Sequence, residues 1–115
     1  MWIPKYRHRI LNAGIKKYLE KLFPKVIEGL PGCEIVKYNI QVEHIHMVMV
    51  IPPKYAVSTV VGKIKGKTSS ELRKKFKWLE KRYWKENMVW SPGYFVLKYV
   101  EYQGRQDSGQ AKLEL

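Results

Sequence analysis

Two histidines separated by a single apolar residue are the first feature of this sequence that could do chemistry. His44 and His46 flank Ile45 within a β-rich, apolar stretch. In a strand, side chains two residues apart leave the same face about 6.5 to 7 Å apart, so both imidazoles can converge on one divalent cation. Two polar residues on a half-exposed strand face would show the same pattern. A third ligand must decide between these interpretations.

The segment 98–103 offers a nucleophile and a further ligand. On a helix, Tyr99 and Gln103 stand one turn apart on the same face, so a hydroxyl and an amide oxygen can approach the same ion. Tyr102 would face away from Gln103. A tyrosine oxygen is a weak nucleophile at its free pKa of about 10, but a metal on the attacked phosphate stabilises the charge that develops. As one of eight tyrosines, Tyr99 is also open to interpretation as an interface aromatic.

The motifs of the common zinc enzymes are absent from the sequence. A zinc protease needs a helix with two histidines four residues apart and a glutamate, and a zinc deaminase needs paired cysteines. The single cysteine, Cys33, has no partner for an internal disulfide and is expected to be a small buried apolar residue. The longest apolar stretch, 47–53, is far shorter than the ~20 residues that cross a bilayer, and no leader is recognisable. We therefore expect a cytoplasmic protein.

The chain is strongly basic, and the charge is concentrated in one region. Its 115 residues carry 22 Lys and Arg against 10 Asp and Glu, a net charge of +12. Residues 54–85 hold eleven of the basic side chains but only two acidic ones, Glu71 and Glu80. Such a field suits a polyanion, and nucleic acid is favoured over a membrane surface because the apolar positions here are needed for the core. A solvated basic helix is the alternative.

The candidate phosphate contacts lie in this basic region, among aromatic side chains. Unpaired bases could stack on Trp78, Tyr83 and Trp84, although the core also needs aromatic residues. A protein held on DNA in this way would be associated with the nucleoid. The residues that we expect to contact DNA phosphates are Lys54, Lys63, Lys65, Lys67, Arg73 and Lys74.

One small domain must position these side chains, because 115 residues without a repeat or a long linker support a single core. We assign residues 1–115 to this domain. The spacing of apolar residues predicts a helix over 14–30, kinked at Pro24, and a second helix over 57–79, interrupted at Gly66. Between them, two strands over 34–42 and 44–51 form a predicted hairpin. The first strand places Val36, Tyr38, Ile40 and Val42 on one side.

The two ends of the chain complete the expected fold. Residues 1–3 have the character of the tail of a strand, and 88–96 form a strand-like stretch broken at Ser91-Pro92-Gly93. A short C-terminal helix is predicted over 97–103. The order β-α-β-β-α-β-α predicts an α+β fold, an antiparallel sheet with helices on one face, of the ferredoxin-like or RRM-like split βαβ type.

Several of these segments together resemble a known family. The sequence resembles the single-tyrosine HUH transposases, the small transposases of the IS200/IS605 type of insertion sequence. Each motif is weak alone, but their order is specific. The matching segments are 2–7 (WIPKYR), 42–47 (VEHIHM), 51–55 (IPPKY), 65–70 (KGKTSS), 90–96 (WSPGYFV) and 98–103 (KYVEYQ).

This resemblance implies a single-stranded DNA endonuclease and strand transferase that works as a homodimer on hairpins at the ends of the element. It implies that His44 and His46 bind Mg²⁺ or Mn²⁺ together with Gln103. It also implies that Tyr99 attacks a DNA phosphate, forming a 5′-phosphotyrosine link and a free 3′-OH. Such a covalent intermediate conserves the phosphodiester energy, so the strands can be rejoined without ATP.

The sequence departs from the family pattern at two places. The chain begins almost inside the first motif, so the first strand is expected to be short. Only Leu97 stands where the family has a longer connection, which lets the tyrosine helix cross to the partner subunit. If this shortening is a real deletion, we expect a folded chain that binds DNA but cleaves it poorly.

Two other functions remain open at this point. A non-catalytic nucleic-acid-binding module of RRM-like fold would use the same basic face without chemistry, although RRM-type aromatic motifs are not spelled here. A metal-dependent nuclease that uses activated water would cleave without becoming attached to its product. Metal dependence separates an enzyme from a binder, and the replacement of Tyr99 by Phe separates tyrosine attack from water attack.

Overall fold

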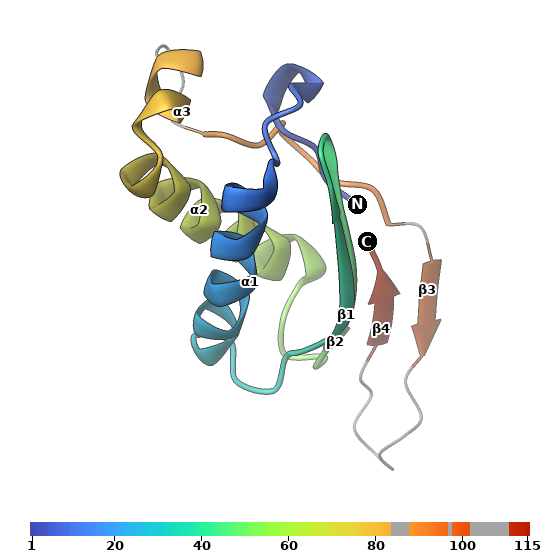
Figure 1. Cartoon of the computed structure of the whole chain (residues 1–115). Helices are drawn as coiled ribbons and strands as arrows, with labels where there is room; N and C mark the ends of the chain where they lie inside the picture. Colours follow the sequence, from blue (N-terminus) through green and yellow to red (C-terminus); the bar gives the residue numbers. More distant parts are fainter. Residues whose placement is uncertain (84–87, 97, 102–110) are drawn as a thin grey trace.

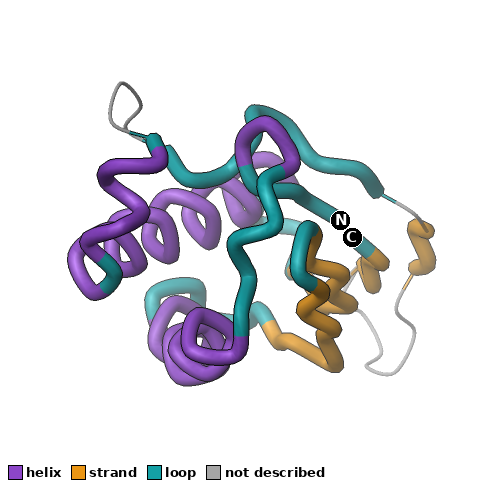
Figure 2. The backbone as a smooth tube through the Cα atoms, turned by 45° about the horizontal axis from the view of Figure 1, so that its top comes forward, coloured by secondary structure: helices purple, strands orange, loops and turns teal. Residues whose placement is uncertain are grey.

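The computed structural model describes residues 1–83, 88–96, 98–101 and 111–115; for 98–101 and 111–114 it describes the backbone. Helices and strands form two layers (Figures 1 and 2). One layer contains α1 (Ala13–Glu28), α2 (Val57–Lys75) and the short α3 (Lys77–Arg82). The other is an antiparallel sheet of β1 (Glu34–Gln41), β2 (His44–Ile51), β3 (Lys98–Glu101) and β4 (Ala111–Glu114), in the order β1-β2-β4-β3. The expected α+β class, with helices on one face of an antiparallel sheet, is confirmed.

α1 begins at a side-chain cap and packs one apolar stripe against the sheet. The Asn12 side chain accepts a hydrogen bond from the Ile15 amide at 3.0 Å, which satisfies one of the unpaired donors at the start of the helix. Five residues at helical spacing are buried, namely Ile15, Leu19, Leu22, Phe23 and Val26. The helix runs on through Pro24, the position at which a kink is expected.

β1 and β2 form the predicted hairpin, with pairs from Glu34↔Val50 to Gln41↔His44. The register shifts between Ile35 and Lys37, which leaves Val36 as an extra residue in β1. Val36 is accordingly exposed, whereas Ile40 lies in the core. The prediction that Val36 shares the side of Ile40 was therefore wrong, because a bulge reverses the alternation on one side of itself.

The basic region forms α2 and α3. α2 continues through the expected break at Gly66 and ends at Lys75, and the extended backbone of Phe76 separates it from α3. Its buried apolar residues, Val60, Val61, Ile64 and Leu72, pack into the core. Three polar side chains of α2 are also buried, namely Lys65, Thr68 and Ser69.

The chain start and residues 88–96 lie side by side as irregular extended segments, with isolated bridges in place of the predicted strands. Trp2 and Ile45 exchange two backbone hydrogen bonds of 3.1 and 2.9 Å, and Pro4 bridges to Trp90. The Ser91 amide donates to the Ile3 carbonyl at 2.9 Å. The first residues therefore lie between β2 and the later segment, and the buried Trp2 and Trp90 rings meet edge to face at 6.2 Å.

The predicted C-terminal helix over 97–103 is not formed by its described residues, because Lys98–Glu101 are strand β3. A helix of seven residues is marginal on its own. Tyr99 and Val100 are residue types that favour strands, and pairing with β4 satisfies the backbone groups of β3. Leu97, Tyr102 and Gln103 lie outside the described residues.

Two glycines give a matched test of this fold. Gly32, in the turn before β1, has φ +91°, and a Cβ there would lie 2.8 Å from Pro52 Cγ. Gly32→Ala is expected to lower the free energy of unfolding by about 1 to 2 kcal/mol. Gly62→Ala, on α2 where a Cβ meets nothing within 4 Å, is expected to raise it by about 0.5 to 1 kcal/mol. Urea unfolding measures both, and equal effects of the two substitutions would contradict this turn geometry.

Candidate functional site

His44 and His46 lie at the start of β2, on the face of the sheet that points away from the helices. The residues that alternate with them, Ile45 and Met47, are fully buried in the core between sheet and helices. The two histidines are only partly buried. His46 lines a cavity of about 240 Å³ together with Lys37, Tyr38, Asn39 and Val48. The prediction that both imidazoles share one strand face is confirmed.

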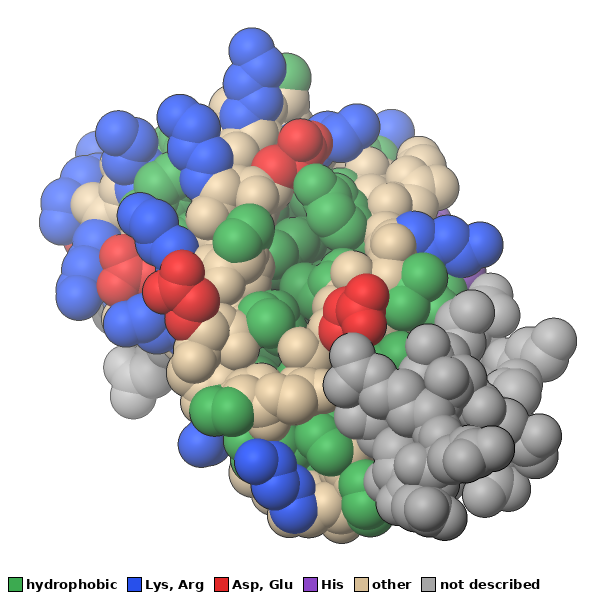
Figure 3. Space-filling model, turned by 90° about the horizontal axis from the view of Figure 1, so that it is seen from below, with side chains coloured by type: hydrophobic (Ala, Val, Ile, Leu, Met, Phe, Trp, Pro, Cys, Tyr) green, Lys and Arg blue, Asp and Glu red, His purple; other side chains and the backbone are tan. Residues whose placement is uncertain are grey.

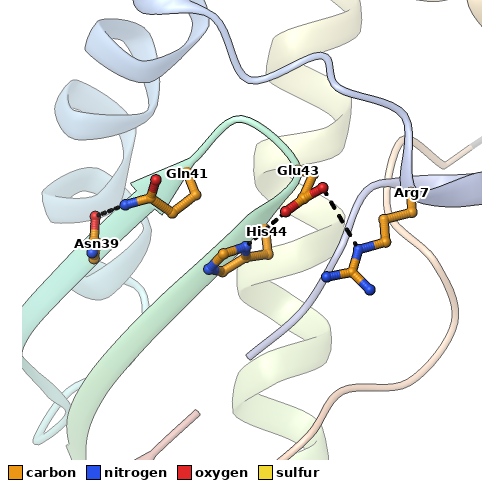
Figure 4. A network of polar contacts seen from close by, with 5 residues as sticks. All are labelled: Arg7, Asn39, Gln41, Glu43 and His44. Atoms are coloured by element: carbon orange, nitrogen blue, oxygen red, sulfur yellow. Dashed lines mark hydrogen bonds and ion pairs between the residues drawn. The ribbon is translucent and has the colours of Figure 1, made fainter.

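A polar network surrounds the first histidine (Figure 4). Glu43, in the turn of the hairpin, has Oε1 3.8 Å from His44 Nδ1 and Oε2 3.9 Å from Arg7 Nε. The backbone of Arg7 and of Tyr6 before it is left-handed, with φ +52° and +60°, a strained conformation for residues other than glycine. This strained turn brings a guanidinium to the carboxylate beside His44.

The site fits a divalent cation in part. Nδ1 of His44 is buried and makes no hydrogen bond with any described residue. Imidazole nitrogens suit Mn²⁺ better than Mg²⁺, which prefers oxygen ligands. In the described part of the chain, no cluster of three or more His, Cys, Asp or Glu side chains could hold a metal. His44 and His46 would supply two ligands, and the third predicted ligand, Gln103, lies outside the described residues.

The structure does not bring Tyr99 to the histidines within one chain. Tyr99 pairs with Leu113 of β4, which pairs with Met49 of β2. Met49 is three residues beyond His46, and β4 separates β3 from β2. The backbone of Tyr99 therefore lies roughly 10 Å along the sheet and roughly 10 Å across it from that of His46. The assignment of Tyr99 as a nucleophile stays a prediction.

The helical side of the molecule carries the basic surface. Lys and Arg side chains gather over the helices beside a hollow lined by apolar side chains (Figure 3). A cavity of about 480 Å³ lies between α1 and α2, with Val26 and Leu30 among the lining residues and Lys25, Lys63 and Lys67 beside them. Lys54, after β2, is also exposed, and its ammonium lies 5.2 Å from the centre of the Tyr55 ring.

The remaining candidates for phosphate and base contacts differ in exposure. Lys74 is exposed and lies 3.9 Å from a carboxylate oxygen of Glu71, and Arg73 is partly buried. Trp78 is exposed and free to present its ring. Tyr83 is buried, its hydroxyl donates to the Lys5 carbonyl at 3.1 Å, and burial raises its pKa to about 12. Tyr83 therefore belongs to the core, and Trp84 lies outside the described residues.

Lys65 is not an exposed phosphate contact, which corrects the prediction for this residue. It is buried, and its Nζ donates to the carbonyls of Ser91 at 2.6 Å and Gly93 at 2.5 Å. Burial lowers the pKa of its ammonium group. The spacing of the basic run could not reveal this, because the acceptors come from a segment 26 to 28 residues later in the chain.

Lys25, Arg7 and Glu43 are the site residues that sequence reasoning missed. Lys25 lies on α1, outside the basic region, and joins Lys63 and Lys67 only because α1 packs beside α2. Glu43 lies between the two predicted strands, at the turn of the hairpin. A signal for it was available, since a carboxylate next to a ligating histidine commonly orients the ring.

The comparison with known proteins decides the family. A family model described as transposase IS200 like matches residues 1–104. The chain belongs to this family. The predicted resemblance is thereby confirmed, and the chain is an IS200-like transposase by family.

Individual relatives of this IS200-like transposase agree with the family assignment. The ISDra2 transposase TnpA of Deinococcus radiodurans is 25% identical over 101 residues, which are 88% of this chain and 71% of that protein. The transposase for insertion sequence element IS200 of Salmonella typhimurium is 31% identical over 96 residues, 84% of this chain. The match spans 62% of the Salmonella protein, less than two thirds of its length.

The fold is shared with a solved structure. A crystal structure of a protein from Deinococcus radiodurans r1 matches with a TM-score of 0.75 and 24% identity over 87% of this chain and 75% of that one. In the described part of this transposase, no helix has both the length and the apolar character needed to span a bilayer.

The groove between α1 and α2 gives a test of the basic surface. Lys25→Ala is expected to weaken the binding of a single-stranded hairpin oligonucleotide and to reduce the slope of log K against log salt by about 0.7 to 0.9, the share of one phosphate contact. Lys16→Ala is the control, because Lys16 is exposed nine residues earlier, on the opposite side of α1. Fluorescence anisotropy at several salt concentrations measures both, and an unchanged slope for Lys25→Ala excludes the groove as a phosphate site.

Proposed function

We propose that this IS200-like transposase is a metal-dependent single-stranded DNA endonuclease and strand transferase that acts on hairpins at the ends of an insertion sequence. The observation that carries the proposal is the placement of His44 and His46 on one outward face of β2 in a chain of this family. A bound Mg²⁺ or Mn²⁺ would polarise the attacked phosphate and offset its developing charge.

In this proposal Tyr99 is the nucleophile. Its phenolic oxygen forms a bond to phosphorus, the bond from phosphorus to the 3′ oxygen breaks, and the phenolic proton passes to the departing 3′ oxygen. The products are a 5′-phosphotyrosine link and a free 3′-OH. Attack by a 3′-OH on that link reverses these bond changes, so joining needs no further energy source. Gln103 would complete the ligand set of the two histidines.

The register of β3 favours an active site built from two copies of the chain. Tyr99 and His46 are separated by β4 and by three residues along the sheet, so attack within one copy requires the tyrosine segment to leave its position in β3. A homodimer in which each copy offers its tyrosine to the histidines of the other removes that conflict. We propose such a dimer, with DNA held by the basic surface of the helices.

The decisive experiment looks for a covalent link between protein and DNA. Labelled single-stranded hairpin oligonucleotides from the DNA flanking the source gene are incubated with the protein and Mn²⁺. A denaturation-resistant adduct is expected, and it should disappear with chelator, with Tyr99→Phe and with His44→Ala. Electron paramagnetic resonance should show that His44→Ala also loses Mn²⁺ binding. His8→Ala is the matched control, since the ring of the third histidine packs against Tyr6 and Tyr83.

Two outcomes would replace this proposal. Binding without an adduct, equal with and without chelator, would identify a non-catalytic nucleic-acid-binding module of RRM-like fold. Cleavage that survives Tyr99→Phe would identify a nuclease that uses activated water. A single mixed-variant measurement tests the dimer: Tyr99→Phe and His44→Ala proteins, each inactive, are expected to form adducts when mixed if the site is shared between copies.

A further inference from the structure

A buried polar stripe on α2 holds one later segment of the chain. Thr68 and Ser69 come three and four residues after Lys65, so the three side chains share a helix face. All three are buried, at 6%, 0% and 1% exposure, whereas the other lysines of α2 are exposed. The Thr68 hydroxyl accepts from the Trp90 indole at 2.9 Å, and the Ser69 hydroxyl accepts from the Val89 amide at 2.8 Å.

Lys65 makes the charged contact of this stripe. Its two carbonyl acceptors, on Ser91 and Gly93, lie on either side of Pro92. Gly93 has φ +80°, so this turn has proline followed by a left-handed glycine, the usual composition of a type II turn. One ammonium group bonded to both carbonyls fixes the direction in which the chain leaves the turn, because charge-assisted hydrogen bonds are stronger than neutral ones.

The segment that these side chains hold, residues 89–93, is connected to both parts of the proposed active site. On one side, Ser91 donates to Ile3, and the neighbouring Trp2 is bonded in both directions to Ile45, the residue between the two histidines. On the other side, the chain continues from Gly93 through Phe95, whose amide donates to Met1 at 2.7 Å, toward β3 and Tyr99. The same turn therefore touches the support of the histidines and begins the path to the tyrosine.

We infer that Lys65 is a positioning residue, which holds the Ser91–Gly93 turn and so sets the placement of the tyrosine segment relative to His44 and His46. The role in positioning rests on the proposed function. The two hydrogen bonds from Lys65 to the Ser91–Gly93 turn, which we call the tether, do not. This inference joins two conspicuous sequence segments, 65–70 and 90–96, through contacts that explain why a lysine in a basic run is removed from solvent.

Hydrogen exchange tests the tether without DNA. Lys65→Met keeps the aliphatic stem but loses the ammonium group, and it is expected to speed exchange of the Ser91 and Phe95 amides at least about tenfold. Lys63→Met, an exposed neighbour on the same helix, is expected to leave these rates unchanged. Lys65→Arg keeps a charged donor and is expected to restore slow exchange in part. Unchanged exchange in Lys65→Met overturns the inference whether or not the protein cleaves DNA.

Adduct formation then tests the positioning role. At saturating hairpin oligonucleotide and Mn²⁺, the rate of adduct formation per folded molecule is expected to fall at least tenfold in Lys65→Met, with the Kd for DNA and its salt dependence unchanged. Val61→Ala, a core substitution on the same helix, supplies a destabilised variant whose rate per folded molecule stays normal. A phosphate contact would give the opposite pattern, a weaker Kd and a salt slope reduced by about one with a normal rate at saturation.

A second variant covers the case in which Lys65→Met does not fold. Thr68→Val removes the acceptor of the Trp90 indole and is expected to speed exchange in the same segment and to slow adduct formation in the same way. If wild-type protein forms no adduct, the proposed function fails while the exchange result still stands. If exchange responds but the adduct rate does not, Lys65 is only structural and the positioning role is overturned.

Discussion

The packing of the core and the placement of the two histidines both depend on the alternation of side chains along β2. Ile45, Met47, Met49 and Ile51 fill the core beneath the helices, and the intervening positions are turned to the outer face. His44 and His46 can therefore be presented together because Ile45 between them is completely buried. A shift of one residue in the pairing with β1 would put both histidines into the apolar core and Ile45 into water. Core packing and site geometry are thus fixed by the same register.

The bulge at Val36 does not disturb the pairing of β1 and β2 near the histidines. β1 is an edge strand, and its extra residue, Val36, lies five residues before Gln41, which pairs with His44. The pairs nearest the histidines, from Lys37↔Val48 to Gln41↔His44, remain continuous. The irregularity is thereby confined to the end of the hairpin remote from the histidines. A twisted, bulged edge also discourages pairing with strands of other molecules.

The sequence was sufficient for features that depend on local pattern and insufficient for those that depend on distant contacts. The α1 stripe, the hairpin and the shared face of His44 and His46 follow from periodicity, which is a property of neighbours in the chain. Strand β3 was mistaken for a helix because seven residues carry too little periodicity, and its partner β4 decides its conformation. Lys65 and Lys25 look like every other lysine in the sequence. Only the packing of α2 against 89–93 and of α1 against α2 distinguishes them.

The basic surface and the two histidines lie on opposite sides of the sheet. The basic groove between α1 and α2 lies in the helical layer, whereas His44 and His46 lie on the opposite face of the sheet. A DNA stem bound at Lys25, Lys63 and Lys67, as we propose, would therefore be separated from the histidines by the sheet. Electrostatic attraction to the helices can concentrate DNA near the protein, but it cannot by itself place a phosphate at β2. In a single copy, DNA would have to pass around a sheet edge to engage both surfaces, whereas in the proposed dimer a second copy would present its own histidine face to DNA that the first copy binds.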